Sequence, residues 1–581
     1  MSARGITLRR CSALALAFAS CLAAQSDRDR KAIDEAEQGW WKAAQATRDQ
    51  RLAWWREARF GCFIHWGVYS GPAGEWNGKP FKGYAEHLMR IQKIPLAEYK
   101  AKVVAPFNPE KFNAEEWVAL IKGAGMKYLI ITAKHHDGFA MWPSKVTKYN
   151  IHDATKFQRD PMRELADACK RNGIRFGFYY SHAFDWEDPD APGNDWDYDN
   201  PGGDKNLHGG VEWYDLHPDL LVKARRYVDR KAIPQVQELI RMYHPDIMWF
   251  DTPQKLPVSE QLRVLEAVRE ADPNVVINGR GARFGRKEFG DYQNTGDRAA
   301  EFRATEGDWE AIPTTNESYG YHQFDDSHKT PQFFVRLLVK AAARGGNLLL
   351  NIGPMGNGEI DPKDQAILRG IGSWMRGNGD SIYGTERTPM APFAWGETTV
   401  KGKTIYLHVF EWPRDGKLTL GDTAVKYRPR EPDAFDTVIP VTEWKADPAR
   451  LLSTVQRNVL GTFDAQTALR FTDGKAPHAY CYGWSSTEQT VLWPARLRTP
   501  GEFEVWVKYS TGSAKSGGRF AVEIGKERLE AAVEATAKDT EPREVKLGTV
   551  KVPAGAADVR VRAIRIEGGE LMRLFSVTLK P

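Results

Sequence analysis

Short apolar runs alternate with amphipathic segments from about residue 55 to residue 380. The runs are rich in β-branched and aromatic side chains, which predicts buried strands; they are "RFGCFIHWGVY", "YLIITAKHH", "IRFGFYYS", "DIMWFD", "VVING" and "NLLLNIGP". The amphipathic segments predict helices. One of them, "DPMRELADACKRNG", has Asp160 as its N-cap and Gly173 as its terminator, and another, "NAEEWVALIKGAG", begins with a capping box from Asn113 to Glu116.

Strands that alternate with helices over about 320 residues indicate an α/β fold with a parallel sheet. The number of repeats favours a closed (β/α)₈-like barrel over an open sheet. No Gly-x-Gly-x-x-Gly motif follows the first strand and no phosphate loop is present, so a nucleotide-binding fold loses support. We therefore predict a (β/α)₈-like barrel over residues 28–385.

The helical pattern stops after about residue 388. Alternating segments such as "VKGKTIYLHVFEW" predict a small antiparallel β-sandwich over residues 386–444. From residue 445 to residue 581, strand-like runs follow at roughly ten-residue spacing with glycine turns between them; this spacing predicts a second β-sandwich.

The N-terminus has the pattern of a secretory signal peptide. Three arginines in the first ten residues precede an apolar, alanine-rich stretch and then small residues. We predict a signal peptide over residues 1–24, with cleavage near Ala24, and a secreted or periplasmic protein. The segment "FASC" resembles a weak lipoprotein box, so lipid anchoring at Cys21 is an alternative. No later segment is long and apolar enough to span a membrane.

Composition narrows the possible partners. The 81 basic and 76 acidic residues leave a net charge of +5, too small to indicate nucleic-acid binding. After cleavage only Cys62, Cys169 and Cys481 remain, which form neither a disulfide framework nor a zinc-binding spacing. Twenty tryptophans leave two interpretations open: a hydroxyl-rich ligand, or aromatic packing in β-rich cores.

Polar side chains follow the predicted barrel strands, where an active site of this fold would lie. Read in order, these positions are His65, His135 with His136, Tyr179 with Tyr180, Asp251 and Arg280. Their recurrence predicts one polar pocket with aromatic walls.

The two adjacent histidines admit three interpretations: a metal site, a hydrogen-bonding clamp on a polyol, and satisfied core residues. On a strand His135 and His136 point to opposite sides, so both could bind one ion only if the chain bends there. We expect a clamp, and neither a metal nor another cofactor.

Asp251 follows a wholly apolar strand, which makes it a candidate nucleophile. A retaining glycosidase also needs an acid/base carboxyl about 5–5.5 Å from the nucleophile. The candidates are Glu301, Glu306, Asp308, Glu310 and Glu317. Glu310 ranks slightly above Glu306, because the preceding Trp309 would desolvate its carboxyl and raise the pKa.

Six motifs resemble those of α-L-fucosidases of glycoside hydrolase family 29, in the family's order and over residues 50–385. They are "ARFGCFIHWGVYSGPAGEW", "GMKYLIITAKHHDGFAMWPSK", "GIRFGFYYS", "IMWFD", "DWE" and "GGNLLLNIGPMGNG". The resemblance implies a retaining exo-fucosidase acting on fucosylated glycans, built as a (β/α) barrel followed by a small β-sandwich.

By motif position, Asp251 matches the family's nucleophile and Glu310 the acid/base of several members. The resemblance further implies that the following residues bind fucose: His65, His135, His136, Tyr179 and Arg280.

The chain departs from the family at one motif. Many members have a Glu-Trp pair where this sequence has Glu86 and His87. We predict that Glu86 contacts the sugar and that Trp76, in the earlier "GEW", supplies the indole.

The C-terminal region lies outside this resemblance and is similar to carbohydrate-binding-module-like β-sandwiches of secreted glycosidases. It is either a glycan-binding domain, with Trp484 or Tyr482 as candidate contacts, or a structural spacer. For the barrel, two alternatives to a fucosidase remain: an enzyme acting on a related glycoside such as a galactoside, and a catalytically silent glycan-binding protein.

Overall fold

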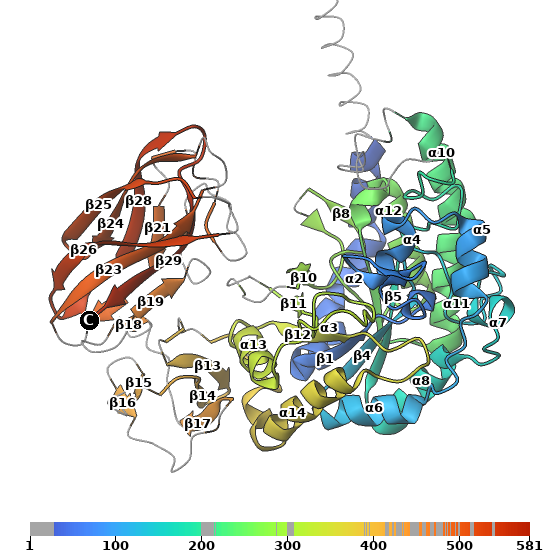
Figure 1. Ribbon diagram of the computed structural model, residues 1–581, viewed down its shortest axis with the longest axis horizontal. Helices are drawn as coiled ribbons and strands as arrows, with labels where there is room; N and C mark the ends of the chain where they lie inside the picture. Colours follow the sequence, from blue (N-terminus) through green and yellow to red (C-terminus); the bar gives the residue numbers. More distant parts are fainter. Residues whose placement is uncertain are drawn as a thin grey trace, which may run out of the picture. The chain divides into compact units, whose positions relative to one another are not determined.

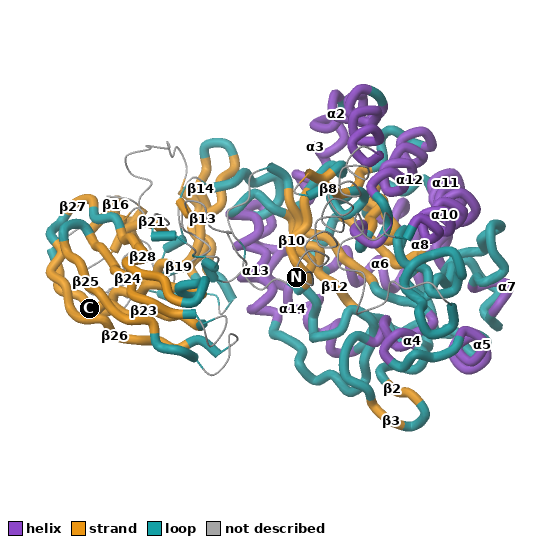
Figure 2. The backbone as a smooth tube through the Cα atoms, turned by 90° about the horizontal axis from the view of Figure 1, so that it is seen from above, coloured by secondary structure: helices purple, strands orange, loops and turns teal. Residues whose placement is uncertain are grey.

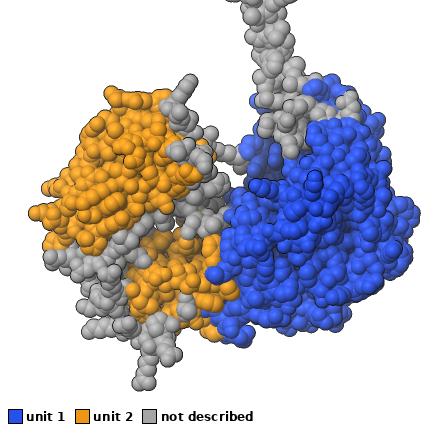
Figure 3. Space-filling view, in the orientation of Figure 1, with its two compact units in different colours: residues 1–298, 307–330, 349–376 blue, residues 299–306, 331–348, 377–581 orange. Residues whose placement is uncertain are grey.

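The computed structural model describes residues 28–198, 217–285, 287–298 and 307–388, together with 214, 302 and most of 390–581. The longer gaps in that last part are 413–417, 426–432, 442–452, 456–460, 465–469, 472–479, 512–515 and 537–540. The predicted signal peptide and Cys21 lie outside the described residues. The chain forms two compact units (Figure 3): one contains residues 1–298, 307–330 and 349–376, the other 299–306, 331–348 and 377–581.

Eight strands form the main sheet, in the order β10-β11-β12-β1-β4-β5-β6-β7 (Figure 1). Their bounds are β1 (Phe60–Ile64), β4 (Tyr128–Lys134), β5 (Arg175–Tyr180), β6 (Ile247–Phe250), β7 (Val276–Ile277), β10 (Gln293–Asp297), β11 (Trp309–Ile312) and β12 (Asn347–Ile352). Neighbours from β1 through β4, β5 and β6 to β7 pair in parallel, as do β10 and β11. A parallel bridge between Asn278 and Tyr292 joins the two edges, next to β7 and β10. The predicted parallel barrel is confirmed.

Helices surround this sheet in the first unit (Figure 2). They are α2 (Trp40–Ala46), α3 (Arg48–Ala58), α4 (Leu88–Ile91), α5 (Leu96–Tyr99), α6 (Ala114–Gly123), α7 (Ile151–Ala154), α8 (Pro161–Asn172), α10 (Pro218–Tyr227), α11 (Ile233–Tyr243), α12 (Val258–Ala271) and α14 (Pro362–Asn378). Shorter turns include the 3₁₀ helix η2 (Ala85–His87) and the π-helix η4 (Val228–Ala232). Two hairpins complete the unit: β2 (Glu75–Trp76) with β3 (Lys79–Pro80), and β8 (Arg283–Phe284) with β9 (Lys287–Glu288).

The predicted helix boundaries follow from local hydrogen bonds. The Asn113 side chain accepts from the backbone N–H groups of Glu115 and Glu116, and its amide donates to the Glu116 carboxylate at 2.9 Å, so Asn113 is the N-cap of α6. Asp160 accepts from the N–H of Arg163, and Gly173 ends α8 in the left-handed region at φ 68°. Both predicted helices are confirmed.

The second unit contains helix α13 (Pro331–Ala343) and a series of mainly antiparallel sheets. The small sheet consists of β13 (Gly396–Lys401), β14 (Thr404–Val409) and β17 (Thr437–Val441), and β15 (Leu418–Leu420) pairs with β16 (Thr423–Val425). Arg344, just after α13, donates to Glu397 of β13 at 3.1 Å. This ion pair helps to attach the helix to the small sheet.

The C-terminal β-sandwich has one sheet in the order β19 (Gly461–Asp464), β29 (Arg573–Lys580), β23 (Gly501–Ser510) and β26 (Arg543–Val552). The other contains β20 (Arg470–Phe471), β21 (Thr490–Trp493), β28 (Val559–Glu567), β24 (Gly517–Ile524) and β25 (Glu527–Val533). A short third sheet consists of β18 (Ser453–Val455), β22 (Ala495–Leu497) and β27 (Gly555–Ala556). The β-sandwich fold that we predicted for the C-terminal region is thus confirmed.

One prediction for this domain is wrong. Trp484 is fully buried within the hydrophobic core, and its indole N–H donates to the Cys481 carbonyl at 3.2 Å, so it is no exposed platform for a sugar. Glycan binding by this domain stays a prediction. Across the described residues, none of the helices combines the length and apolar character needed to cross a bilayer.

Candidate active site

The pairing register of β4, β5 and β6 brings the C-terminal ends of these strands to the same height along the barrel axis. Thr132 of β4 pairs with Tyr179 of β5, which pairs with Trp249 of β6. His135 stacks on Tyr179 with ring centres 5.2 Å apart and planes 9° apart, and the His65 ring lies 5.3 Å from the same tyrosine. The predicted polar, aromatic cluster is therefore assembled at the C-terminal edge of the sheet, where barrel active sites lie.

Asp251, directly after β6, is held by three donors. Its Oδ1 accepts from Arg280 at 2.8 Å and from the Thr252 N–H at 2.9 Å, while Oδ2 accepts from the Tyr179 hydroxyl at 3.1 Å. Burial raises the pKa of Asp251, and the Arg280 charge opposes that shift. Thr252 has φ 49°, a backbone conformation that non-glycine residues rarely adopt and that recurs at functional sites.

The guanidinium of Arg280 spans two carboxylates. One terminal nitrogen donates to Asp251; the other donates at 2.8 Å to Asp297, the last residue of β10. The guanidinium lies over the Trp249 ring, 5.2 Å from its centre. Burial acts to lower the pKa of Arg280, but the two carboxylates outweigh burial and raise the pKa above its usual value. The guanidinium is therefore always charged.

The imidazoles of the cluster are neutral at physiological pH. Burial lowers the pKa of His65 to about 3, and it lowers the pKa of His135 and His136 well below the usual value. His65 Nδ1 lies 2.7 Å from Asn351 Oδ1, and His136 Nδ1 lies 2.6 Å from Ser181 Oγ. His135 Nδ1 is buried and has no hydrogen-bond partner among the described residues. A neutral imidazole can donate at one nitrogen and accept at the other, which suits a ligand hydroxyl.

The two adjacent histidines do not point to opposite sides. Strand β4 ends at Lys134, after a register irregularity that begins at Thr132, and the rings of His135 and His136 lie only 4.3 Å apart. The alternation of side chains applies only within an extended strand. Possible ligand atoms of His87, His135 and His136 all lie within 4.8 Å of one another, so these three could hold a transition-metal ion.

His87, which stands where many members of the resembled family have a tryptophan, lies beside the two adjacent histidines. Its ring lies 5.4 Å from His136 and 5.9 Å from His135, and its pKa is lowered by burial to about 3. Trp76 lies on the β2–β3 hairpin at the rim of the unit (Figure 2), where its ring contacts Lys102. Among the described residues no hydrogen bond or ring contact joins Trp76 to the cluster, and its contact with a sugar stays a prediction. Trp186, whose ring lies 5.7 Å from His87, was missed by sequence reasoning.

Glu86 lies in η2, beside His87, and is 2% exposed. Its Oε2 accepts from the Gly320 N–H at 2.8 Å and from Ser318 Oγ at 3.4 Å. Burial raises the pKa of Glu86 to about 7. Its contact with a sugar stays a prediction.

Glu310 lies inside the barrel, away from the C-terminal edge. It is fully buried, and Tyr128, the first residue of β4, donates to it at 2.8 Å. Further donors are the indole of Trp249 at 3.1 Å and the hydroxyl of Tyr292 at 3.0 Å. Burial raises the pKa of Glu310 to about 7, as we expected, but a carboxyl enclosed by these side chains does not reach a leaving group at the pocket mouth. The geometry therefore contradicts the acid/base assignment for Glu310.

The other described candidate acids form ion pairs with basic side chains outside the histidine cluster. Asp308, at the start of β11, pairs with Arg48 and Arg56 of α3, each at 2.7 Å. Glu317 is exposed and pairs with Arg298 and Lys329. Glu301 and Glu306 lie outside the described residues. Asp297 was missed, although its place at a strand end is the signal that identified the other positions.

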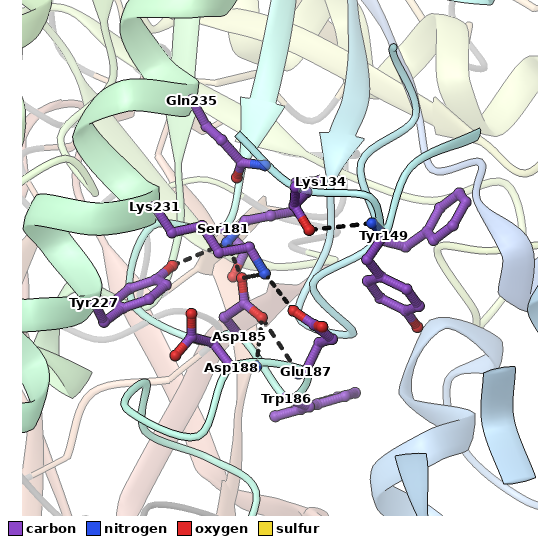
Figure 4. A network of polar contacts seen from close by, with 12 residues as sticks. Lys134, Tyr149, Ser181, Asp185, Trp186, Glu187, Asp188, Tyr227, Lys231 and Gln235 are labelled. Carbon is purple, nitrogen blue, oxygen red and sulfur yellow. Dashed lines mark hydrogen bonds and ion pairs between the residues drawn. The ribbon is translucent and has the colours of Figure 1, made fainter. Parts of the chain in front are cut away.

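A buried ionic network includes Lys134, the residue that precedes His135 (Figure 4). Asp185 accepts from Lys134 at 2.7 Å and from Lys231 of η4 at 2.8 Å, and Lys231 also contacts Glu187 at 2.8 Å. Burial would raise the pKa of Asp185, but the two lysines hold it at about 2, and burial lowers the pKa of Lys134 to about 8. Asp185 is therefore an anion between two buried cations.

The same network supports His136. The N–H of Trp186, next to Asp185, donates to the His136 carbonyl at 2.7 Å, and the N–H of Ser181 donates to the Lys134 carbonyl at 2.9 Å. A Cβ at Gly138 would lie 2.1 Å from Asp185 Oδ1, and its φ is 77°, so only glycine fits there. The glycine of the "KHHDG" motif thus allows the close approach of this loop to Asp185.

Comparison with known proteins gives consistent matches. The sequence profile of the family described as alpha-L-fucosidase matches residues 28–380. Tissue alpha-L-fucosidase of Rattus norvegicus is 30% identical over 444 residues, which cover 71% of this chain and 88% of that protein. Every residue of the candidate site lies inside the matched profile.

Two solved structures extend the comparison. The alpha-L-fucosidase from Vibrio sp. strain EJY3 is 25% identical with a TM-score of 0.73, covering 93% of this chain and 99% of that one. Alpha-L-fucosidase isoenzyme 1 from Paenibacillus thiaminolyticus is 31% identical with a TM-score of 0.57, covering 69% of this chain and all of that one.

Asp185→Asn is expected to destabilise the barrel unit by about 3–5 kcal/mol, because two buried ammonium groups lose their shared counter-charge. Urea unfolding followed by tryptophan fluorescence measures the loss. Asp326→Asn is the matched control, since that carboxylate is exposed where it pairs with Lys363; this variant should unfold like the parent. An unchanged midpoint for Asp185→Asn would contradict the role of the network.

Glu310→Gln is expected to change how stability depends on pH. In the folded protein burial keeps this carboxyl protonated up to about pH 7, whereas in the unfolded chain it ionises near pH 4.5. Between these values the folded state binds more protons, so the free energy of unfolding contributed by Glu310 falls as pH rises. The amide cannot ionise. Relative to the parent, the variant should therefore gain on the order of 3 kcal/mol between about pH 4 and pH 8. Urea unfolding at both pH values measures this difference, and a pH-independent difference would contradict it.

Proposed function

The chain belongs to the α-L-fucosidase family of glycoside hydrolases, and we propose that it removes terminal α-L-fucosyl groups from glycans by double displacement with retention of configuration. In this proposal Asp251 is the nucleophile. His65, His135, His136, Tyr179, Arg280 and Glu86 bind the sugar, and the protein acts outside the cytoplasm after loss of residues 1–24.

The observation that best supports the proposal is the set of hydrogen bonds that holds the Asp251 carboxylate. Its Oδ1 accepts from two donors, whereas among the described residues Oδ2 accepts only from the Tyr179 hydroxyl and lies 3.9 Å from His136 Nε2. Oδ2 is therefore the oxygen free to attack an anomeric carbon. A carboxylate fixed by Arg280 and surrounded by neutral imidazoles fits an exo-acting enzyme that binds one sugar ring.

The reaction would proceed in two steps. First, Asp251 Oδ2 forms a bond to the anomeric carbon while the bond to the leaving oxygen breaks and an acid protonates that oxygen. Second, water attacks the same carbon as a base removes its proton, and the ester bond to Asp251 breaks. Two inversions return the original anomeric configuration.

The histidines and Arg280 would select the sugar through its hydroxyls. Each buried donor or acceptor left unpaired by the wrong sugar costs free energy, so an analogue lacking one hydroxyl should react poorly. Initial rates on nitrophenyl α-L-fucoside and nitrophenyl β-D-galactoside test the substrate class. Faster galactoside hydrolysis would assign the barrel to the related glycoside, and inactivity on both would favour a glycan-binding protein.

Asp251→Gly should abolish hydrolysis of nitrophenyl α-L-fucoside, because no carboxylate attacks the anomeric carbon. Added azide should restore turnover on an activated fluoro or dinitrophenyl α-L-fucoside by attacking from the vacated side, so the product is the β-fucosyl azide. Asp251→Asn should likewise be inactive and folded, as shown by an unchanged unfolding midpoint. Residual hydrolysis above a few per cent of the parent, with contaminating enzyme excluded, would overturn the nucleophile assignment.

Hydrolysis should survive prolonged incubation with EDTA, because we propose that the imidazoles of His135 and His136 bind sugar hydroxyls directly. The rate on nitrophenyl α-L-fucoside before and after dialysis measures this. If activity is lost and a divalent transition metal restores it, the histidine trio with His87 holds an ion that the reaction needs.

A further inference from the structure

Asp297 is the carboxylate that lies opposite Asp251 across Arg280. Both accept at 2.8 Å from terminal nitrogens of the one guanidinium. Because the two nitrogens belong to one rigid fork, both carboxylates lie next to the same guanidinium; the two carboxyl groups of a retaining glycosidase are typically ~5–5.5 Å apart. The side chain of Asp297 is 48% exposed, whereas that of Asp251 is 17% exposed. Asp297 therefore lies on the solvent side of the pair, where a leaving group departs.

Strand register separates Asp297 from Glu310 along the barrel. In the parallel pair β10–β11, Glu310 is level with Asn294, and Asp297 is level with Ile312, nearer the C-terminal edge. Trp249 lies between the two residues: its ring face contacts Arg280, which binds Asp297, and its N–H donates to Glu310. Glu310 thus lies on the inner side of the indole and Asp297 on the outer side of Arg280.

We propose that Asp297 is the general acid/base of this enzyme, an inference that rests on the proposed double displacement. In the first step its Oδ–H gives a proton to the glycosidic oxygen as Asp251 Oδ2 bonds to the anomeric carbon. In the second step its carboxylate takes a proton from the attacking water as the ester bond to Asp251 breaks. The proton that Asp297 lost is then restored.

Arg280 couples the two carboxylates. While Asp251 is ionised, the guanidinium divides its charge between two anions; once Asp251 is esterified, Asp297 alone faces the cation. Burial acts to raise the pKa of Asp297, but Arg280 outweighs it and holds the value below the usual range. The pair would titrate together, with a pH–rate profile displaced toward acid.

The test compares an unactivated fucosyl disaccharide with dinitrophenyl α-L-fucoside. Asp297→Ala should lower disaccharide hydrolysis by about 10²–10⁴-fold, because the departing alkoxide is no longer protonated. The glycosylation rate on the dinitrophenyl substrate should fall far less, because that leaving group needs no proton. Azide should accelerate its turnover by attacking the β-fucosyl-enzyme, so the product is the α-fucosyl azide, the anomer opposite to that expected from Asp251→Gly.

Three variants serve as comparisons. Glu317→Gln removes an exposed carboxyl and should behave like the parent on both substrates. Glu310→Gln should keep the parent's ratio of the two rates and show no azide effect. Asp297→Asn, which preserves side-chain volume, should repeat the pattern of Asp297→Ala if the alanine variant fails to fold.

The proposal is overturned if both Asp297 variants are folded and lose the two rates equally without azide rescue, which would make Asp297 a positioning residue for Arg280. It is also overturned if a variant of Glu310, Glu86, Glu301 or Glu306 shows the azide-dependent pattern instead. A parent protein inactive on both fucosides, or an Asp251→Gly variant that yields no β-fucosyl azide, would instead refute the proposed function.

Discussion

An ionised side chain inside a closed barrel must face an opposite charge or several hydrogen-bond donors, and the interior of this barrel is arranged around that requirement. At the C-terminal edge, Arg280 forms ion pairs with both Asp251 and Asp297. Deeper inside, Glu310 has no ion pair with any described residue; aromatic hydroxyls and an indole N–H surround it, and burial raises its pKa to about 7. The first arrangement keeps carboxylates charged and near solvent, and the second favours a neutral, structural carboxyl.

The same requirement explains the support of the histidine pair. Lys134 precedes His135 and is fully buried, so it needs the Asp185 anion, and Lys231 balances the remaining negative charge of Asp185 and Glu187. Lys231 lies on the π-helix η4, a distortion that often marks functional regions. Because the segment around Asp185 also hydrogen-bonds the His136 backbone, the charge network and the orientation of the imidazoles are linked.

The cluster also shows how a neutral surface can bind a neutral sugar. Burial keeps His65, His135 and His136 unprotonated, so these rings add no charge beside Asp251. A neutral ring can donate at one nitrogen and accept at the other, and His65 and His136 already use Nδ1 within the protein. His87 adds a fourth imidazole beside His135 and His136, so this part of the wall can form hydrogen bonds. Trp186 remains as the aromatic surface beside it.

The amino-acid sequence by itself determined the parallel barrel, the antiparallel domains after it and the strand-end positions of His65, Tyr179, Asp251 and Arg280. Strand length and apolar pattern are local properties that can be read from the sequence. Parallel strands of a barrel bring their C-terminal ends to the same edge, independently of side-chain packing. Only the tertiary structure decided which way His135 and His136 point, because β4 stops before them and strand alternation no longer applies. It alone also showed that Glu310 lies deep in the barrel and Asp297 at its mouth. That difference depends on the stagger between β10 and β11, which is set by packing between residues distant in the sequence.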